Sequence, residues 1–369
     1  MDVFALMDEA HGRGASDLHL SVGRPPVMRL SGSLVEVGDA PLKPEDTEAM
    51  AKSVTPPRNW DELQKVGTTD FGYAHRDKCR FRISVLTQKG TRGIVMRQIP
   101  QKLLTFEQLG LPESVQQLLT LHRGLVLVTG PTGSGKSTTL YSVLASLNAA
   151  DCNISTVEDP VEATLAGVNQ FQVNDKAGFT FAGALRALLR QDPDVLMVGE
   201  IRDGETAGTA VQAALTGHLV FSTLHTNDSI SAMTRLVNLG IEPYLVAAVV
   251  RGVLAQRLVR RICPHCREHF EPDALVRAEI EAAAGSVEHF ARGAGCARCR
   301  GSGFSGRLGV FELLVPDEHF IAAIARGAVL QELSAIARAA GHLPMRHDGL
   351  EKVRLGQTTF EEVVLATAS

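Results

Sequence analysis

The segment from Gly130 to Ser137 constrains the fold of this chain most, because it matches the pattern G-x-x-x-x-G-K-[ST]. An apolar run over 124–129 precedes it, and we expect a helix over 138–147 after it. Between a strand and a helix, such a glycine-rich loop wraps its backbone N–H groups around phosphates. The expected nucleotide-binding residues are Gly130, Pro131, Thr132, Gly133, Ser134, Gly135, Lys136, Ser137 and Thr138. We expect Lys136 to face the outer phosphates and Ser137 to offer its hydroxyl to Mg²⁺.

Three more short apolar runs follow the loop, over 154–157, 195–198 and 219–222, each ending in a polar segment. Runs that are apolar throughout are typical of strands buried on both faces. The pattern predicts a largely parallel sheet flanked by helices, which is an α/β unit built around the phosphate loop.

Carboxylates and histidines stand at the ends of these runs. Glu200 follows the run over 195–198, where it could hold Mg²⁺ directly or through water, and residues 158–162 add carboxylates that could orient an attacking water. His218 and His225 flank the run over 219–224. From position alone, each carboxylate could equally be a solvated loop charge, and a single histidine is more often structural than functional.

The cysteines form a second pattern, C-x2-C-x29-C-x2-C, made by Cys263, Cys266, Cys296 and Cys299. This spacing lets four thiolates surround one zinc ion tetrahedrally. Because four thiolates would leave no open coordination position, we expect a structural zinc site that holds a small subdomain together.

Composition limits the partners. With 37 Lys and Arg against 41 Asp and Glu, the formal charge is -4, so no overall positive field favours nucleic acid or anionic lipid. The first residues lack a secretory signal, and no apolar run approaches the roughly 20 residues of a transmembrane helix. We expect a cytoplasmic protein that reaches a membrane through a partner.

The domain organisation follows from changes in pattern along the chain. We expect an N-terminal α+β domain over 1–104, with a linker over 99–112, and a phosphate-loop core over 105–255. The cysteine subdomain is expected over 256–310 and a helical segment over 311–369.

In combination, these motifs resemble the secretion ATPase superfamily of type II secretion and type IV pili, the GspE/PulE and PilB/PilT family. The resemblance rests on four ordered blocks: the Walker A loop 130–137, the Asp box 156–162, the Walker B segment 194–202 and the His box 216–225. It covers nearly the whole chain. It implies a RecA-like P-loop NTPase domain with a smaller PAS-like N-terminal domain and a zinc-binding subdomain.

The resemblance also implies roles for particular side chains. The residues to which it assigns catalytic roles are Lys136, Glu162, Glu200, His218, His225, Arg82 and Arg97. Glu162 matches the general base, Glu200 acts through Mg²⁺, and the histidines support activity. Arg82 and Arg97 match arginines that reach the γ-phosphate when the small domain closes, which would couple hydrolysis of ATP to motion.

As a whole, the resemblance implies a homohexameric ATPase, using ATP, Mg²⁺ and Zn²⁺, that acts with an inner-membrane platform protein to assemble pilin or pseudopilin. The four cysteines match assembly-type members, whereas the first hundred residues resemble the short N-terminus of retraction-type members. A retraction ATPase and a slow ATP-binding scaffold are the alternatives. A DNA-transfer ATPase of the conjugation type is disfavoured by the cysteines.

Overall fold

Contacts in the computed structural model, which describes residues 2–30, 33–76, 78–99, 103–287 and 290–368, divide the chain into two units. The first comprises Met1–Leu103 and Pro160–Thr164, and the second Leu104–Asp159 and Leu165–Ser369. Part of the expected linker, residues 100–102, lies outside the described residues. No helix in the described ranges is both long and apolar enough to cross a bilayer.

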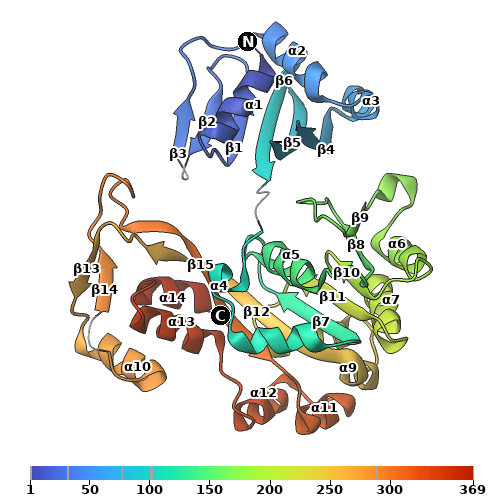
Figure 1. Cartoon of the computed structure of the whole chain (residues 1–369), viewed down its shortest axis with the longest axis vertical. Helices are drawn as coiled ribbons and strands as arrows, with labels where there is room; N and C mark the ends of the chain where they lie inside the picture. The colour runs from blue at the N-terminus through green and yellow to red at the C-terminus, as the bar shows by residue number, and fades with distance from the viewer. Residues whose placement is uncertain (1, 31–32, 77, 100–102, 288–289, 369) are drawn as a thin grey trace. The chain divides into compact units, whose positions relative to one another are not determined.

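The first unit is an antiparallel sheet with helices packed against it (Figure 1). Its elements are α1 (Val3–Gly12), β1 (Asp17–Leu20), β2 (Val27–Leu30), β3 (Ser33–Glu36), α2 (Pro44–Val54), α3 (Pro57–Val66), β4 (Thr68–His75), β5 (Cys79–Gln88) and β6 (Thr91–Ile99). The strand order is β3-β2-β1-β6-β5-β4, and every neighbouring pair is antiparallel.

Period-two alternation gives this sheet one apolar and one polar face. On β5, Phe81, Ile83 and Val85 are buried, whereas Arg82 between them is exposed. The buried face shares a core with the apolar residues of α1, α2 and α3. The polar face therefore remains available to position charged side chains.

The second unit is built on a mostly parallel sheet. Its elements before the sheet's last strands are α4 (Phe106–Leu109), the 3₁₀ helix η1 (Glu113–Thr120), β7 (Gly124–Thr129), α5 (Lys136–Leu147), β8 (Ile154–Glu158), β9 (Asn169–Gln172), the 3₁₀ turn η2 (Asp175–Ala177), α6 (Phe181–Leu188), β10 (Val195–Val198), α7 (Gly204–Leu215), β11 (Leu219–Leu224), α8 (Ser229–Asn238) and α9 (Pro243–Val249). The remaining elements are β12 (Val250–Ile262), β13 (Arg267–Phe270), α10 (Ala274–Ala284), β14 (Phe290–Gly293), β15 (Phe304–Leu314), α11 (Glu318–Ala325), α12 (Leu330–Ala339), α13 (Met345–Arg354) and α14 (Phe360–Thr367).

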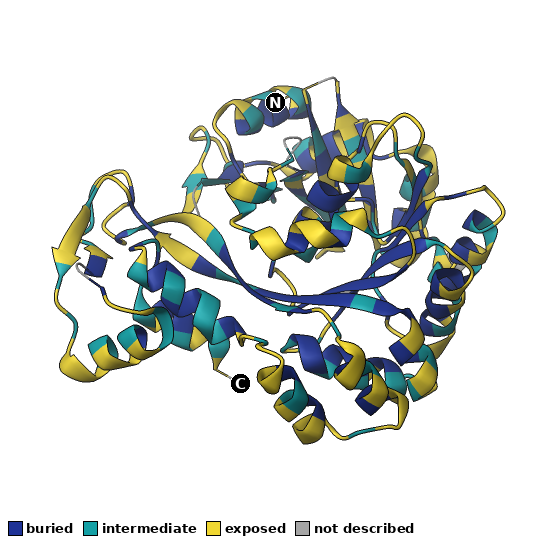
Figure 2. Cartoon of the chain, turned by 60° about the horizontal axis from the view of Figure 1, so that its bottom comes forward, coloured by how far each residue is buried: buried dark blue, intermediate teal, exposed yellow. Residues whose placement is uncertain are grey.

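The large sheet has the order β15-β12-β7-β11-β10-β8-β9, and only the β12–β15 pair is antiparallel among its described neighbours. This confirms the largely parallel sheet predicted from the apolar runs. Every residue of β7, β10 and β11 is buried, and Figure 2 shows the sheet's strands dark blue through the middle of the unit. Helices α6 to α9, α11 and α12 share one core with these strands.

A long hairpin carries the cysteine segment. β12 pairs in parallel with β7 over its first half and antiparallel with β15 along most of its length, up to the pair Ile262↔Phe304. Residues 263–303 lie between these two partners and contain the small β13–β14 sheet and α10. The domain boundaries expected at 255/256 and 310/311 fall inside β12 and β15. The pairing of these two strands joins residues far apart in the chain, so the local sequence did not show where either strand ends.

Candidate functional site

The phosphate loop connects β7 to α5 and is shaped by its glycines. Gly130 has a φ of 148°, a conformation that L-residues rarely adopt. A Cβ atom at Gly130 would lie 2.4 Å from the backbone oxygen of Gln256, so a larger residue would push the loop away from β12. The loop then enters α5 at Lys136, so the start of that helix faces the place where phosphates would bind.

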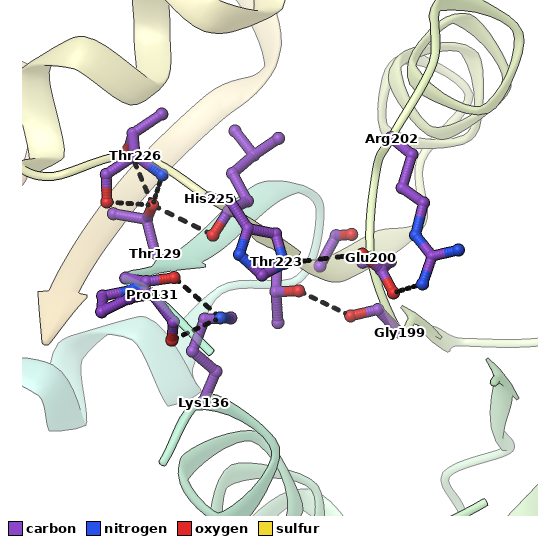
Figure 3. Close-up of polar contacts among 12 residues, drawn as sticks. Thr129, Pro131, Lys136, Gly199, Glu200, Arg202, Thr223, His225 and Thr226 are labelled. Atoms are coloured by element: carbon purple, nitrogen blue, oxygen red, sulfur yellow. Dashed lines mark hydrogen bonds and ion pairs between the residues drawn. The ribbon is translucent and has the colours of Figure 1, made fainter. Parts of the chain in front are cut away.

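Lys136 is folded over its own loop. Its Nζ atom donates to the carbonyl oxygens of Gly130 at 2.8 Å and Pro131 at 3.1 Å (Figure 3). Main-chain carbonyls are neutral acceptors, whereas phosphate oxygens are charged and form stronger hydrogen bonds. The ammonium group is therefore already at the loop and can exchange these contacts for a phosphate.

The other predicted loop residues differ in exposure. Pro131, Thr132, Gly133 and Thr138 are exposed, Gly135 and Ser137 are half-buried, and Ser134 is buried beneath the loop. Ser137 occupies the first turn of α5, next to Lys136, as a hydroxyl ligand of Mg²⁺ requires.

Glu200 follows β10 and lies between Arg202 and His225. Its Oε1 atom accepts a hydrogen bond from Arg202 Nη2 at 2.5 Å, and its Oε2 atom lies 3.5 Å from His225 Nε2. Burial opposes ionisation of Glu200, but the Arg202 hydrogen bond and the charges of Arg202, His225 and Lys136 outweigh it, so the pKa of this carboxyl is lowered. Glu200 is therefore a carboxylate at neutral pH, the form that binds a divalent cation.

The two histidines lie at opposite ends of β11. His225 follows the carboxyl end of the strand and joins Glu200, as Figure 3 shows. His218 precedes the strand and its Nδ1 atom lies 3.0 Å from the carbonyl oxygen of Ala213, at the end of α7. The structure thus brings His225, Glu200 and the phosphate loop to one edge of the sheet and leaves His218 at the other.

Threonine side chains that we did not single out from the sequence hold this edge together. Thr129 Oγ1 contacts the carbonyl oxygens of Leu224 and Thr226, both at 3.1 Å, and accepts a hydrogen bond from the Thr226 backbone at 2.9 Å. Thr223 Oγ1 donates to the carbonyl oxygen of Gly199 at 2.7 Å. These contacts join the carboxyl ends of β7, β10 and β11. The signal in the sequence is a threonine within two residues of the carboxyl end of a buried strand.

The acidic segment 158–162 is divided by the structure. Glu158 is 4% exposed and accepts hydrogen bonds from Tyr141 Oη, from Thr156 Oγ1 at 2.5 Å and from Gln170 Nε2 at 3.1 Å. These contacts make Glu158 a buried structural carboxylate. Glu162 is exposed and belongs to the segment Pro160–Thr164, which groups with the first unit.

The two predicted arginines of the first unit are cross-strand partners. Arg82 on β5 lies opposite Arg97 on β6, and Arg97 lies opposite Asp17 on β1. Asp17 Oδ1 accepts a hydrogen bond from Arg97 Nε at 2.9 Å, and Asp17 Oδ2 lies 3.8 Å from Arg29 Nε. Burial disfavours the charged form of Asp17, but the contacts with Arg97 and Ser16 prevail and lower the pKa of the carboxyl. The buried aspartate thus anchors Arg97, whose side chain is 71% exposed, by its Nε end.

The four predicted cysteines converge. Their sulfur atoms all lie within 4.8 Å of one another, with separations of 4.0 Å for Cys263–Cys296 and 3.7 Å for both Cys266–Cys299 and Cys296–Cys299. Four sulfurs placed tetrahedrally about 2.3 Å from a zinc ion would be about 3.8 Å apart. The donor set and its dimensions therefore fit a tetrahedral metal ion.

Backbone groups prepare one thiol of this cluster for a metal. The N–H of Cys296 lies 3.1 Å from Cys299 Sγ and that of Gly303 lies 3.3 Å from it. The Cys296 N–H contributes most, and with the Gly303 N–H and the thiols of Cys296 and Cys266 it outweighs burial and lowers the pKa of Cys299 to about 6. Gly303 has a φ of 75°, and a Cβ there would lie 2.5 Å from the oxygen of Gly293, so the turn requires glycine.

Comparison with known proteins finds a matching family and similar chains. Residues 69–365 match the family described as type II/IV secretion system protein. The type II secretion system protein HxcR of Pseudomonas aeruginosa is 44% identical over 378 residues, which cover 98% of this chain and 76% of HxcR. The type IV pilus assembly ATPase PilB of Thermus thermophilus is 49% identical over 265 residues, which cover 70% of this chain and 29% of PilB.

A solved structure is similar over the full length of the chain. The pilus retraction motor PilT with bound ADP matches with a TM-score of 0.82 and 33% identity, and the match covers 100% of this chain and 98% of PilT.

Proposed function

The chain belongs to the type II/IV secretion system protein family, and from this premise we propose that it is an ATPase motor that drives the assembly of pilin or pseudopilin subunits. The observation that carries the proposal is the edge of the large sheet where Lys136, Glu200 and His225 meet the phosphate loop. This edge combines a phosphate cradle with an ionised carboxylate, which hydrolysis of a nucleoside triphosphate requires.

The proposed reaction is an in-line attack of water on the γ-phosphorus of ATP. Glu162 takes a proton from the water, an oxygen–phosphorus bond forms, and the bond from the γ-phosphorus to the bridging oxygen breaks, so that ADP and phosphate leave. Mg²⁺, held by Ser137 and by Glu200 directly or through water, would neutralise charge on the phosphates. Lys136 and the loop N–H groups bind the phosphates, and His225 keeps Glu200 in place from the end of β11.

Arg82 and Arg97 are proposed to stabilise charge on the γ-phosphate when the first unit closes on the second. The geometry within the first unit supports this role, because Asp17 binds Arg97 at Nε and leaves both Nη groups without a side-chain partner among the described residues. An arginine held in this way is oriented before it meets its phosphate, so less entropy is lost on contact.

The remaining assignments extend the proposal beyond the hydrolysis site. We assign structural zinc to the four cysteines, since the sulfur separations match a tetrahedral zinc site. We also assign a PAS-like fold to the first unit, on the basis of its antiparallel sheet and the helices on one face. A homohexamer would act in the cytoplasm on an inner-membrane platform protein, and His218, at the opposite end of β11 from His225, is proposed to support activity. Nucleic acid is not among the proposed partners.

Assembly and retraction are separated by phenotype. Assembly is favoured by the high identity to HxcR and PilB and by the four cysteines, whereas the similarity to PilT supports retraction as the second candidate. Deletion of an assembly motor removes surface filaments or secreted substrates. Deletion of a retraction motor instead leaves cells with excess filaments.

The enzymatic proposal is tested with purified protein. We expect Mg²⁺-dependent release of phosphate from ATP that is lost in Lys136→Ala and in Glu162→Gln. Glu113→Gln, which changes an exposed glutamate in η1, is the matched control. Unchanged turnover in Glu162→Gln would remove that residue as the base. A wild-type turnover that stays near zero even with the cytoplasmic part of a platform protein would favour the scaffold alternative.

A further inference from the structure

Gln256 lies directly beneath the phosphate loop and has no role in the mechanism above. It is 1% exposed and follows Ala255, the β12 residue that pairs with Thr129 at the end of β7. Its Nε2 atom donates a hydrogen bond of 2.7 Å to the carbonyl oxygen of Ser134. A buried side-chain amide on one strand therefore holds the main chain of the loop on the next.

The loop is fitted closely around this residue. An added Cβ at Gly130 would lie 2.4 Å from the Gln256 backbone oxygen, and one at Gly135 would lie 3.2 Å from Gln256 Nε2. Leu258, which points to the same face of β12, would be 3.8 Å from that second Cβ. The glycines of the loop are thus close to Gln256 on both sides of Ser134.

Two buried polar atoms at this place have no hydrogen-bond partner among the described residues: Gln256 Oε1 and Ser134 Oγ. Burying an unpaired acceptor is unfavourable, and a methionine or leucine would fill similar space without this cost. The amide is therefore poorly explained by packing alone. The hydrogen bond that its Nε2 atom makes within the described part of the chain is directed at the phosphate loop.

We propose that Gln256 is a positioning residue for the ATP reaction, which holds the Ser134 carbonyl inward so that the N–H groups of the loop face the phosphates. A carbonyl turned outward would present an acceptor to the negatively charged phosphates and would repel them. Gln256 acts before the chemical step, by organising the loop in the nucleotide-free protein. The inference rests on ATP binding at this loop, as proposed above.

The test uses two variants of the same shape. Gln256→Met removes the donor, and Gln256→Glu replaces the donor by a carboxylate that faces the Ser134 carbonyl. From the worth of one hydrogen bond, we expect Gln256→Met to raise the Kd for ADP and the KM for ATP about three- to tenfold, with kcat nearly unchanged. Gln256→Glu should weaken binding further, because its negative charge lies under the phosphates.

A matched control separates positioning from stability. Thr358 is fully buried and its Oγ1 atom donates to the carbonyl oxygen of Arg260 at 2.8 Å, on the same strand but away from the loop. Thr358→Val should lower the Tm by an amount similar to Gln256→Met while leaving the Kd for ADP unchanged.

Each outcome decides the inference. If Gln256→Met binds ADP as the wild type does, the amide serves packing and the inference is overturned. The same follows if Gln256→Met and Thr358→Val lose affinity for ADP equally. Loss of the folded state in both Gln256 variants would also overturn it, because the residue would then determine folding. The Kd for ADP is measured without turnover, so a wild-type protein that binds ADP but does not hydrolyse ATP would contradict the proposed function and leave this test intact.

Discussion

The phosphate loop and the four-cysteine cluster are both short turns that can hold a charged ligand, but they are supported differently. The loop lies at the end of β7, a strand that is buried along its whole length between β11 and β12. The cluster lies on turns between β12 and β15, beside a two-stranded sheet and a small apolar group centred on Ile280 and Phe290. The phosphate loop is thus supported by the main core, and the cysteine turns by a small separate apolar group.

This difference indicates what holds each site in its folded structure. The buried strand and the hydrogen bonds of the threonines hold the loop in place without its ligand. A substitution in the loop should therefore lower activity and leave the fold intact. The cysteine turns have little core of their own, and metal binding would supply much of their stability. A change at a cysteine should therefore remove structure locally.

Loss of one cysteine should give the largest effect. Structural zinc contributes about 10–16 kcal/mol of apparent binding free energy in small modules, so Cys299→Ser should purify with almost no zinc and with residues 263–303 sensitive to protease. Elemental analysis and limited proteolysis measure this. Cys152→Ser, outside the cluster, is the control. A Cys299→Ser protein with a full complement of zinc would contradict the proposed ligand set, and one whose ADP affinity also collapsed would break the contrast between the two sites.

Removing the loop cation should have the next largest effect. Lys136→Ala should lower kcat/KM by about 10²–10³-fold, because a preorganised positive charge at the transferring phosphate is lost. The Tm should stay that of the wild type, since the loop is held by glycines, Gln256 and threonines rather than by this side chain. Lys65→Ala, at an exposed site in α3, is the control. A large drop in Tm would show that the loop, like the cysteine turns, depends on a charged group for its structure.

A smaller effect is expected where a charged side chain is only oriented. Asp17→Asn should lower kcat about tenfold, because Arg97 loses its anchor and must be ordered during the reaction. Asp70→Asn changes an exposed aspartate in β4 of the same sheet and should have no effect. If Asp17→Asn is silent while Arg97→Ala abolishes activity, the anchor is dispensable. If both are silent, Arg97 does not act on the phosphate.

The smallest effect concerns the link between α14 and β12. Glu362 accepts hydrogen bonds from the Arg260 backbone at 2.9 Å and side chain at 3.0 and 2.6 Å, and the Arg260 side chain is the main reason why the pKa of Glu362 is lowered from 4.5. A carboxyl whose pKa is lowered in the folded state stabilises the folded protein at pH values above its unfolded-state pKa. This contribution is lost as the pH falls through the folded-state pKa. We expect Glu362→Gln to cost about 1 kcal/mol at pH 7 and progressively less at acidic pH.

Denaturant titrations of the wild type, Glu362→Gln and the neighbouring exposed-site control Glu361→Gln at several pH values measure this effect. A difference between wild type and Glu362→Gln that persists unchanged at pH values well below 4.5 would show that geometry, and not charge, holds the helix.

The sequence predicted what is local and missed what depends on distant pairing. The loop, Glu200 and His225 could be placed because each follows an apolar run that forms a buried strand, and parallel strands bring their carboxyl ends to one edge. The spacing of the cysteines likewise predicts four sulfur atoms close enough to bind one metal ion. By contrast, Thr129 meets Thr226, and Glu158 meets Tyr141, only after the strands have been ordered in the sheet. The separation of His218 from His225 also depends on where the strand between them begins and ends.

The pair Ile262↔Phe304 has a consequence for how the chain can vary. Because the two ends of the segment 263–303 are cross-strand neighbours, the segment is an insertion at the tip of a hairpin, and a tight turn could replace it without moving either strand. Loop-closure entropy grows slowly, by about 0.6 kcal/mol for each doubling of loop length, so a long insertion at this tip is only mildly unfavourable. The hairpin is therefore a position at which whole modules can be gained, lost or exchanged while the strand beneath the phosphate loop stays in register.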